Sequence, residues 1–268
     1  MKKLLIGFAL VSLAAGCASR QVASEVRLLS WNLGHFSRGA STASAIPNAQ
    51  ASAFAASYRT FVAEADVVGL CEYNEAFTSN GQHRTSACVF SDFAKTIGPA
   101  KGAMQNALMT RRFSIMDRRT KFFPQHCEDA YYVALKLNVA GVPVWFVQAH
   151  LDSRVYLQGH FKDRESQMQT LINDFKDEEN VVLCGTFNVG IRIPGSKCFP
   201  APEEYRIFEK AGYMLANVNG TGTYPTDDPL QPVDNIIVKG VGISDIHFVS
   251  PGDLSDHFAI TCKLTVYR

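Results

Sequence analysis

Short apolar runs recur along this sequence, and each meets a polar side chain at one end. The run Val181–Cys184 continues through Gly185 to Asn188, a pattern typical of a buried strand whose glycine lets the backbone come close to a neighbour. Four further runs share this design, with the polar residue just after or just before the run: Leu28–Trp31 with Asn32, Val67–Cys71 with Glu72, Val144–Ala149 with His150, and Asn235–Val238 with Asp234. Asp256 and His257 likewise precede a strand with alternating apolar residues, Phe258–Tyr267. Six strands that each present a carboxylate, amide or imidazole predict one sheet edge where polar groups converge, as in a metal-assisted hydrolase.

The rest of the chain alternates between helix-like and strand-like patterns. Apolar residues at helical spacing predict helices in four segments: Ala49–Ala65, Val89–Ile97, Lys162–Phe175 and Glu203–Ala211. Short strands are expected in two segments and a hairpin around Ala140-Gly141: Ala107–Thr110 and Phe113–Arg118, then Tyr131–Val139 and Val142–Ala149. Strands joined partly by helices and partly by hairpins predict a mixed sheet.

Composition predicts one large globular domain and gives little support to a nucleic-acid partner. The chain has 268 residues, of which 47% are hydrophobic and 19% charged, so a sizeable core is available. Its formal net charge is +1, and no basic patch is visible. This balance does not exclude nucleic acid, because a bound divalent cation supplies positive charge of its own.

The first residues have the layout of a bacterial lipoprotein signal. Lys2 and Lys3 precede an apolar run from Leu4 to Ala15, and Gly16 and Cys17 follow. The run is too short for a permanent membrane span, and the alternative is a buried N-terminal helix. We expect residues 1–17 to comprise the signal and the lipidated Cys17, residues 18–25 a spacer, and residues 26–268 the domain. The mature protein is then exported and anchored by lipid to the cell envelope, at the outer membrane or the periplasmic face.

The other six cysteines fall into two groups. Cys71, Cys184 and Cys262 lie in apolar runs, where a cysteine behaves as a small buried hydrophobe. The second group lies in loop-like surroundings, where pairing is open to an exported protein: Cys88, Cys127 and Cys198. The sequence does not determine which of them pair.

Six short motifs, taken in order, resemble the endonuclease/exonuclease/phosphatase superfamily: Trp31-Asn32, Glu72, His150-Leu151, Gly185-Thr186-Phe187-Asn188, Asp234-Asn235-Ile236 and Ser255-Asp256-His257. The superfamily includes nucleases similar to deoxyribonuclease I, bacterial sphingomyelinases and inositol-polyphosphate phosphatases. The resemblance runs from about Val26 to the C-terminus. It implies an α/β (α+β) fold in which a sandwich of two β-sheets is flanked by helices, giving four layers.

The resemblance also implies a metal site. An ionised carboxylate at the end of an apolar strand is costly unless it meets a cation, and Glu72 stands at such a position. In the family this glutamate is the principal ligand of Mg²⁺, or of Mn²⁺ or Ca²⁺, with the equivalents of Asn32 and Asp256 nearby. Hard cations of this kind need only one or two carboxylates because they keep several waters. Glu75 is the local competitor for the ligand role.

Catalytic roles follow from the same resemblance. Asp234 orients His257 and stabilises its charged form, as an orienting carboxylate does for a catalytic histidine. His150 donates to a phosphate oxygen or assists the leaving group. Asn188 orients the phosphate or the attacking water.

Thr186 departs from the family pattern, which reads Gly-Asp-Phe-Asn at this strand. The family's aspartate is proposed to accept a proton from the attacking water, and a hydroxyl cannot do so at neutral pH. Three alternatives remain: another group is the base, with His257 first and Asp152 or Asp227 after it; the enzyme is slow; or the chemistry is lost. We expect hydrolysis to be retained, because the other matched polar positions are intact.

The expected function is therefore that of a divalent-metal-dependent phosphoesterase, a monomer in which water attacks phosphorus in line. The alternative is a catalytically impaired member that binds a phosphorylated ligand. A sugar-binding lipoprotein would need an aromatic groove, whereas Trp31 and Trp145 fall within apolar strands. Nucleic acid, a phospholipid head group and an inositol phosphate are all candidate substrates, and the loops Tyr73–Ala87 and Val189–Pro202 are expected to decide between them.

Overall fold

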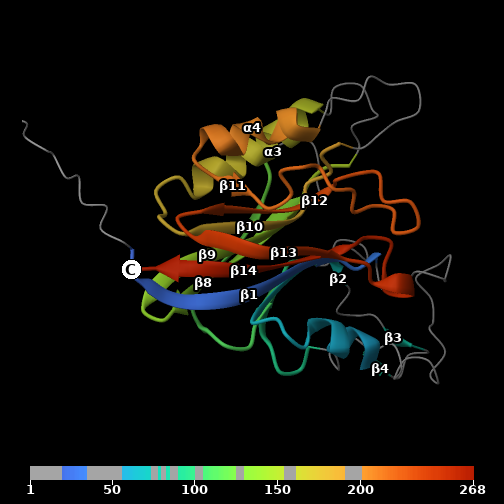
Figure 1. The fold of residues 1–268 in the computed structure, drawn as a ribbon, viewed down its shortest axis with the longest axis horizontal. Helices are drawn as coiled ribbons and strands as arrows, with labels where there is room; N and C mark the ends of the chain where they lie inside the picture. Colours follow the sequence, from blue (N-terminus) through green and yellow to red (C-terminus); the bar gives the residue numbers. More distant parts are fainter. Residues whose placement is uncertain are drawn as a thin grey trace, which may run out of the picture.

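The computed structural model of the protein describes residues 20–34, 56–73, 78–79, 83–84, 90–99, 105–124, 130–153, 161–190 and 201–268. The segment expected to be a lipoprotein signal lies outside these residues, as do Glu75 and the second group of cysteines, Cys88, Cys127 and Cys198. Within the described residues, two six-stranded sheets face each other, with helices on the outside (Figure 1). No helix in these ranges is both long and apolar enough to cross a membrane.

The first sheet contains both ends of the domain. Its strands lie in the order β13 (Gly242–Val249), β14 (Ala259–Tyr267), β1 (Val22–Asn32), β2 (Val67–Tyr73), β6 (Gln105–Thr110) and β5 (Ala94–Ile97). β1 and β2 are parallel, and the other neighbours are antiparallel. β1 begins at Val22, four residues before the expected start of the domain, because Val22 and Ser24 pair with Tyr267 and Val266 of β14.

The second sheet contains the hairpin that the sequence predicts. Its order is β11 (Met214–Leu215), β12 (Asp234–Lys239), β10 (Val181–Thr186), β9 (Val142–His150), β8 (Tyr131–Val139) and β7 (Ser114–Phe122). Only β9 and β10 are parallel among these neighbours. The remaining elements are the small hairpin β3 (Thr78–Ser79) and β4 (His83–Arg84), the helices α3 (Phe161–Asp174) and α4 (Ala201–Lys210), a helical segment at 56–62 and the 3₁₀ helix η2 (Gly252–Leu254).

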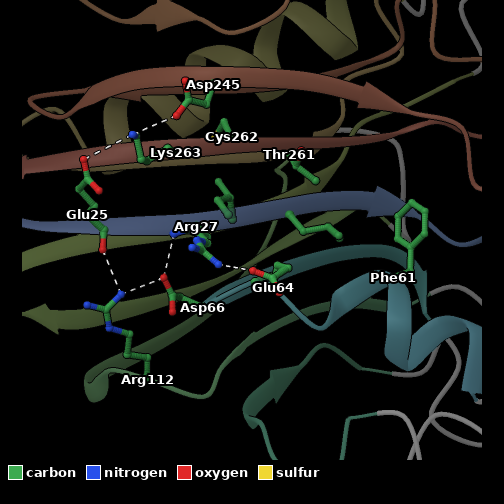
Figure 2. A pocket seen from close by; sticks show the side chains of 13 residues that line it. Glu25, Arg27, Phe61, Glu64, Asp66, Arg112, Asp245, Thr261, Cys262 and Lys263 are labelled. Atoms are coloured by element: carbon green, nitrogen blue, oxygen red, sulfur yellow. Dashed lines mark hydrogen bonds and ion pairs between the residues drawn. The ribbon is translucent and has the colours of Figure 1, made fainter.

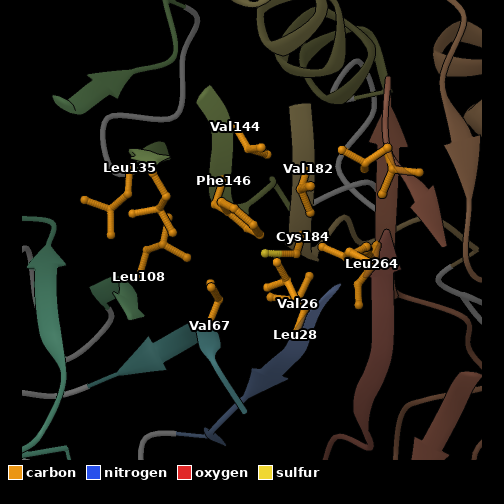
Figure 3. Close-up of a cluster of buried hydrophobic side chains, with 14 of the residues drawn as sticks. Val26, Leu28, Val67, Leu108, Leu135, Val144, Phe146, Val182, Cys184 and Leu264 are labelled. Carbon is orange, nitrogen blue, oxygen red and sulfur yellow. The ribbon is translucent and has the colours of Figure 1, made fainter. Parts of the chain in front are cut away.

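The main core lies between the two sheets. Val26 and Leu28 of the first sheet pack with Phe146 and Val182 of the second, and all four are buried (Figure 3). Each such side chain contributes roughly 1.5–3 kcal/mol on removal from water. The close approach of β10 to β9 depends on Gly185, which has a φ of +134° and where an added Cβ would lie 2.0 Å from the Ala149 carbonyl oxygen.

Two outer layers complete a four-layer arrangement. α3 and α4 cover the second sheet, where Met168 and Leu171 of α3 pack with Leu183 of β10. The segment 56–62 covers part of the first sheet, where Tyr58 and Val62 pack with Trp31. Figure 1 shows these helices on opposite sides of the sandwich. Central strands such as β2, β6 and β10 are buried on both faces, which is why they are continuous apolar runs in the sequence.

Two expectations from the sequence are wrong. The polar strand ends belong to two facing sheets and not to one sheet edge. The helix predicted at Val89–Ile97 is absent from its described part: residues 90–92 form a turn, and Ala94–Ile97 forms strand β5 against β6. Phe90 and Phe93 have helical spacing, but long-range pairing with Ala107–Thr110 determines the conformation of the residues that follow.

Candidate active site

The polar ends of six strands meet at one end of the sandwich. The parallel pairs β1–β2 and β9–β10 end there, and β12 and β14 begin there because they run antiparallel to β10 and β1. Thr186 is the central position of the second sheet at this end, since it is in register with His150 on one side and Asp234 on the other. The topology thus brings the residues singled out in the sequence to one place.

Glu72 is directed into this place by an irregularity in β2. Its φ is +52°, and the register between β2 and β6 shifts between Leu70 and Tyr73, as in a β-bulge. A left-handed conformation is unfavourable for glutamate and is commonly retained where function requires it. The carboxylate accepts a hydrogen bond from Asn32 Nδ2 at 3.2 Å. Glu72 is therefore half-buried and held by a neighbouring strand.

His257 and Asp234 form a buried pair. His257 Nδ1 lies 2.8 Å from Asp234 Oδ2, and the side chains are only 8% and 5% exposed. Burial opposes the charge of Asp234, but the charge and hydrogen bond of His257 outweigh it and hold the pKa of Asp234 below its ordinary value. Burial likewise opposes the charge of His257, yet the Asp234 carboxylate raises the pKa of His257 above its ordinary value. The pair is therefore biased towards imidazolium and carboxylate.

The backbone around His257 is fixed by three further hydrogen bonds. Trp31 Nε1 donates to the His257 carbonyl oxygen at 3.1 Å, and the His257 amide donates to Ser255 Oγ at 3.1 Å. Ser255 Oγ in turn donates to the Asn32 carbonyl oxygen at 2.6 Å. The ring of Tyr224 lies beside the imidazole, with 4.6 Å between the ring centroids. Because Nδ1 is bonded to Asp234, Nε2 is the imidazole nitrogen that remains for proton transfer.

The hydroxyl of Thr186 joins Asp234 to Asn32. Thr186 Oγ1 donates to Asp234 Oδ1 at 2.7 Å and accepts from Asn32 Nδ2 at 3.2 Å. The side chain is buried, with 1% of the residue exposed. Its single proton is thus committed to Asp234, and the hydroxyl cannot serve as a base. Another group must accept a proton if water is activated here.

Asp256 provides the observation that bears on a metal ion. Its Oδ1 is buried and has no hydrogen-bond partner among the residues that the structure describes. Gly34 makes room for this carboxylate: its φ is +52°, and an added Cβ would lie 2.7 Å from Asp256 Oδ1. The charges of Asp256 and Glu72 also act to raise the pKa of His257. A buried carboxylate oxygen without a proton donor fits a cation ligand.

The described residues contain no group of three or more His, Cys, Asp or Glu side chains placed to hold a metal ion. Two carboxylates still fit a cation such as Mg²⁺, which usually takes one or two and completes its shell with water and substrate oxygens. The amide oxygen of Asn32 accepts from the Gly34 amide at 3.0 Å, and its Nδ2 faces Glu72 and Thr186. In this arrangement Asn32 orients Glu72, and the second lone pair of its amide oxygen remains available to a cation.

His150 lies on the opposite side of Thr186 from Asp234, and Asn188 is the second residue after Thr186. Asn188 has a φ of +55° and donates through Nδ2 to the Leu151 carbonyl oxygen at 2.6 Å. His150 ends β9 and is half-buried. Of the other base candidates, Asp152 is buried two residues after His150, whereas Asp227 is exposed in a turn after Thr226. The sequence-predicted residues of the described chain are therefore brought together.

Sequence reasoning missed three residues at this site. Arg164 and Gln167 are buried polar residues of α3, and Tyr224 packs on His257. A signal for the first two exists, because Arg164 and Gln167 have the same helical spacing as Met168 and Leu171. A polar residue on the apolar face of a helix needs a buried partner.

A separate pocket of about 690 Å³ opens on the outer face of the first sheet, away from these residues (Figure 2). Its charged side chains pair with one another. Lys263 lies 3.0 Å from Asp245 and 3.5 Å from Glu25, and Arg112 lies 3.0 Å from Asp66. Because these charges are mutually compensated, the pocket has the character of a solvated sheet face, and the chemistry lies at the strand ends.

Comparison with known proteins gives matches in structure only. No family model and no curated protein matches the chain. TDP2 from D. rerio, complexed with a single-strand DNA product, has a TM-score of 0.67 at 16% identity over 90% of this chain and 99% of that chain. An endonuclease/exonuclease/phosphatase from Bacteroides vulgatus has a TM-score of 0.64 at 17% identity over 91% and 99%. The human Nocturnin catalytic domain with bound sulfate has a TM-score of 0.64 at 16% identity over 91% and 95%. These likenesses confirm the expected fold class.

Proposed function

We infer that this chain, which has the fold of the endonuclease/exonuclease/phosphatase proteins, is a divalent-metal-dependent phosphoesterase in which water attacks phosphorus in line. The observation that carries the proposal is the buried Asp256 Oδ1, for which the described residues provide no hydrogen-bond partner, next to the hydrogen-bonded pair of His257 and Asp234. A cation site beside a histidine with an orienting carboxylate is a combination suited to hydrolysis of a phosphate ester.

In the proposed mechanism Glu72 and Asp256 hold Mg²⁺, or Mn²⁺ or Ca²⁺, and Asn32 keeps Glu72 in place. When bound, the cation supplies positive charge that neutralises the phosphate and stabilises the transition state. Asn188 orients the phosphate or the attacking water through its amide. His150 donates to a phosphate oxygen or assists the leaving group.

His257 is the first candidate for the missing base. It accepts the proton of the attacking water at Nε2, while the Asp234 carboxylate stabilises the imidazolium that forms. The raised pKa of His257 makes its neutral form less populated but a stronger base than an isolated imidazole, and this neutral form is the reactive one. Asp152 and Asp227 are the further candidates. Thr186 fixes Asp234 and takes no proton itself.

The proposed substrate is a phosphate ester: nucleic acid, a phospholipid head group or an inositol phosphate. The D. rerio neighbour was crystallised with single-strand DNA and the human one with sulfate, and both ligands present phosphate-like oxygens. We also propose that Cys17 carries lipid and anchors a monomeric protein to the bacterial cell envelope.

The test is hydrolysis of bis(4-nitrophenyl) phosphate, nucleic acid, sphingomyelin and phosphoinositides by the purified mature chain, with Mg²⁺ and with a chelator. Turnover should require the metal and fall on His257→Ala by about 10²-fold or more. Glu72→Ala should abolish both turnover and calorimetric Mg²⁺ binding. The matched control is His247→Ala, because His247 is an exposed histidine on β13. Chelator-resistant turnover would refute metal dependence.

The second candidate function is binding of a phosphorylated ligand without turnover. It is favoured by Thr186, whose hydroxyl is bonded both to Asp234 and to Asn32 and cannot act as a base. Calorimetric binding of inorganic phosphate or an inositol phosphate, with no hydrolysis in the whole screen, would support this candidate. Metal-dependent turnover that is lost on His257→Ala would exclude it.

A further inference from the structure

Helix α3 carries two polar residues on the face that packs against the second sheet. Arg164 is 1% exposed and Gln167 is 0% exposed. They are three residues apart and share the face of Met168 and Leu171, which pack on β10 with the rest of the outer core. Burying polar groups at such positions is unfavourable unless hydrogen bonds compensate. Their partners therefore indicate what these residues do.

Arg164 of α3 connects Glu204 of α4 to Asn188, the second residue after β10. Its guanidinium donates to the Asn188 carbonyl oxygen at 2.7 Å, and its Nε donates to Glu204 Oε2 at 2.9 Å. A second nitrogen of the guanidinium donates to the same carboxylate oxygen. Asn188 is the residue with a left-handed backbone whose side chain reaches towards Leu151. Arg164 thus fixes the backbone of a proposed phosphate-orienting residue.

Gln167 holds the segment that follows β9. Its Oε1 accepts a hydrogen bond from the Asp152 amide at 3.0 Å. Leu151, one residue earlier, donates its amide to the Thr186 carbonyl oxygen at 2.9 Å and accepts from Asn188. Two neighbouring residues of one helix therefore bond to the two segments that follow His150 and Thr186, and these segments also bond to each other.

We propose that Arg164 and Gln167 are positioning residues for the reaction, and that they set His150 and Asn188 relative to the pair of His257 and Asp234. This inference rests on the proposed function. Packing of α3 on the sheet does not need them, because Met168, Leu171 and Phe175 already provide the apolar contact. A buried ion pair contributes little net stability over a hydrocarbon of equal volume, so its geometric role is the informative one.

The experiment compares three substitutions in the mature chain: Gln167→Met, Arg164→Lys and, as a matched control, Lys136→Met. Gln167→Met keeps the shape of the side chain and removes the acceptor for the Asp152 amide. Arg164→Lys keeps the positive charge but removes the planar guanidinium, whose nitrogens bond to both Glu204 and Asn188. Lys136 also forms an ion pair, with Glu178 at 3.1 Å, but it lies on β8 away from the site. Readouts are kcat and KM for bis(4-nitrophenyl) phosphate with Mg²⁺, and hydrogen exchange of the Asp152 amide.

Gln167→Met and Arg164→Lys should lower kcat by about tenfold or more with a smaller change in KM, because a small misplacement of reacting groups is costly. Gln167→Met should also speed exchange of the Asp152 amide while the Trp145 amide, bonded to Asn180 at 3.0 Å, stays protected. Lys136→Met should change neither. Unchanged exchange at Asp152, or unchanged kcat in both variants, overturns the inference.

Failure of the two proposals is distinguishable. If the unmodified chain hydrolyses no ester, the proposed function fails and the positioning role fails with it, whereas equal turnover by the unmodified chain and both variants overturns the positioning role alone. If Arg164→Lys does not fold, the kinetic constants and the Asp152 amide exchange are both measured on Gln167→Met. Slower turnover in all three variants, Lys136→Met included, would indicate a general loss of stability and overturn the positioning role.

Discussion

Thr186 donates its hydroxyl proton to one carboxylate oxygen of Asp234 at 2.7 Å, while the other oxygen lies 2.8 Å from His257 Nδ1. Thr186 therefore places a neutral hydroxyl next to Asp234. An aspartate at position 186 would instead place a second carboxylate there. Asp234 receives two hydrogen bonds through this arrangement, and its charge is matched by a single histidine. With threonine at position 186, the polar network around Asp234 is internally satisfied.

Thr186→Asp should destabilise the metal-free protein. The new carboxylate would lie against Asp234 in a buried site, and an uncompensated buried charge costs on the order of 3 kcal/mol. Mg²⁺ should recover most of this loss and raise hydrolysis by about 10²-fold or more, since a positioned base becomes available. Thermal unfolding with chelator and with Mg²⁺ measures the first effect, and Thr186→Ser, which keeps the hydroxyl, is the control. Equal metal-free stability of the wild type and Thr186→Asp would contradict this account.

The pair of His257 and Asp234 should stabilise the fold within a limited pH window. The pKa of Asp234 is lowered below 3.8, so its contribution is present above that value and is lost as the pH falls through the folded pKa. The pKa of His257 is raised above 6.5, so its contribution is present below that value and is lost as the pH rises through the folded pKa. Stabilisation by the pair is therefore greatest between about pH 4 and about pH 6.5.

Asp234→Asn tests this window. In chelator, the difference in unfolding free energy between the wild type and the variant should be on the order of 3 kcal/mol at about pH 5 and should shrink towards about pH 9. Chemical denaturation at a series of pH values measures it. A difference that is independent of pH over this range would show that the pair does not titrate as described.

Gly34→Ala should weaken metal binding more than it weakens the fold. The added Cβ would meet Asp256 Oδ1 at 2.7 Å, and φ at this position is +52°. Gly141→Ala is the matched control, because its φ is +89° and an added Cβ there meets nothing within 4 Å. Both variants lose about 1 kcal/mol through the strained backbone, but only Gly34→Ala displaces the carboxylate. Calorimetry should show weaker Mg²⁺ binding in Gly34→Ala alone, and equal affinities would remove Asp256 from the proposed ligands.

Cys17→Ser should abolish lipid attachment. A thiol is the acceptor of the lipid in a lipoprotein signal, and a hydroxyl does not replace it. Labelling of cells with a radioactive fatty acid should mark the wild type and leave the variant unmarked. Label that persists in Cys17→Ser would count against both the assignment of the anchor and the expected location in the cell envelope.

The chemistry of the candidate site was largely readable because its residues stand next to apolar strands. Asn32, His150 and Asp234 each border a run whose burial is plain from composition alone. The arrangement of those strands in two facing sheets was not readable from periodicity, because strands buried on both faces lose the alternation that marks a sheet face. The two-sheet arrangement was expected only from the resemblance to a known family.

Other features depended on contacts between distant parts of the chain. The left-handed conformation of Glu72 arises where the pairing of β2 with β6 shifts, and no local residue signals it. The apolar pattern of the helix does not identify Arg164 and Gln167, because it depends on hydrophobic residues alone. The spacing of Phe90 and Phe93 predicts a helix, although pairing with β6 determines the conformation of Ala94–Ile97.

The direction of β1 has a consequence for the reach of a tethered protein. β1 starts at Val22, beside the C-terminal end of the domain, and ends at Asn32 in the candidate site (Figure 1). A strand of 11 residues spans about 35 Å, whereas the three residues from Cys17 to Arg20 span about 10 Å at most. A lipid on Cys17 would therefore hold the far end of the sandwich at the bilayer and turn the catalytic end outward. Esters arriving from the surrounding fluid are then accessible, while head groups of the anchoring leaflet lie beyond reach, so vesicle-bound protein should cleave a dissolved phosphodiester and spare its own lipids.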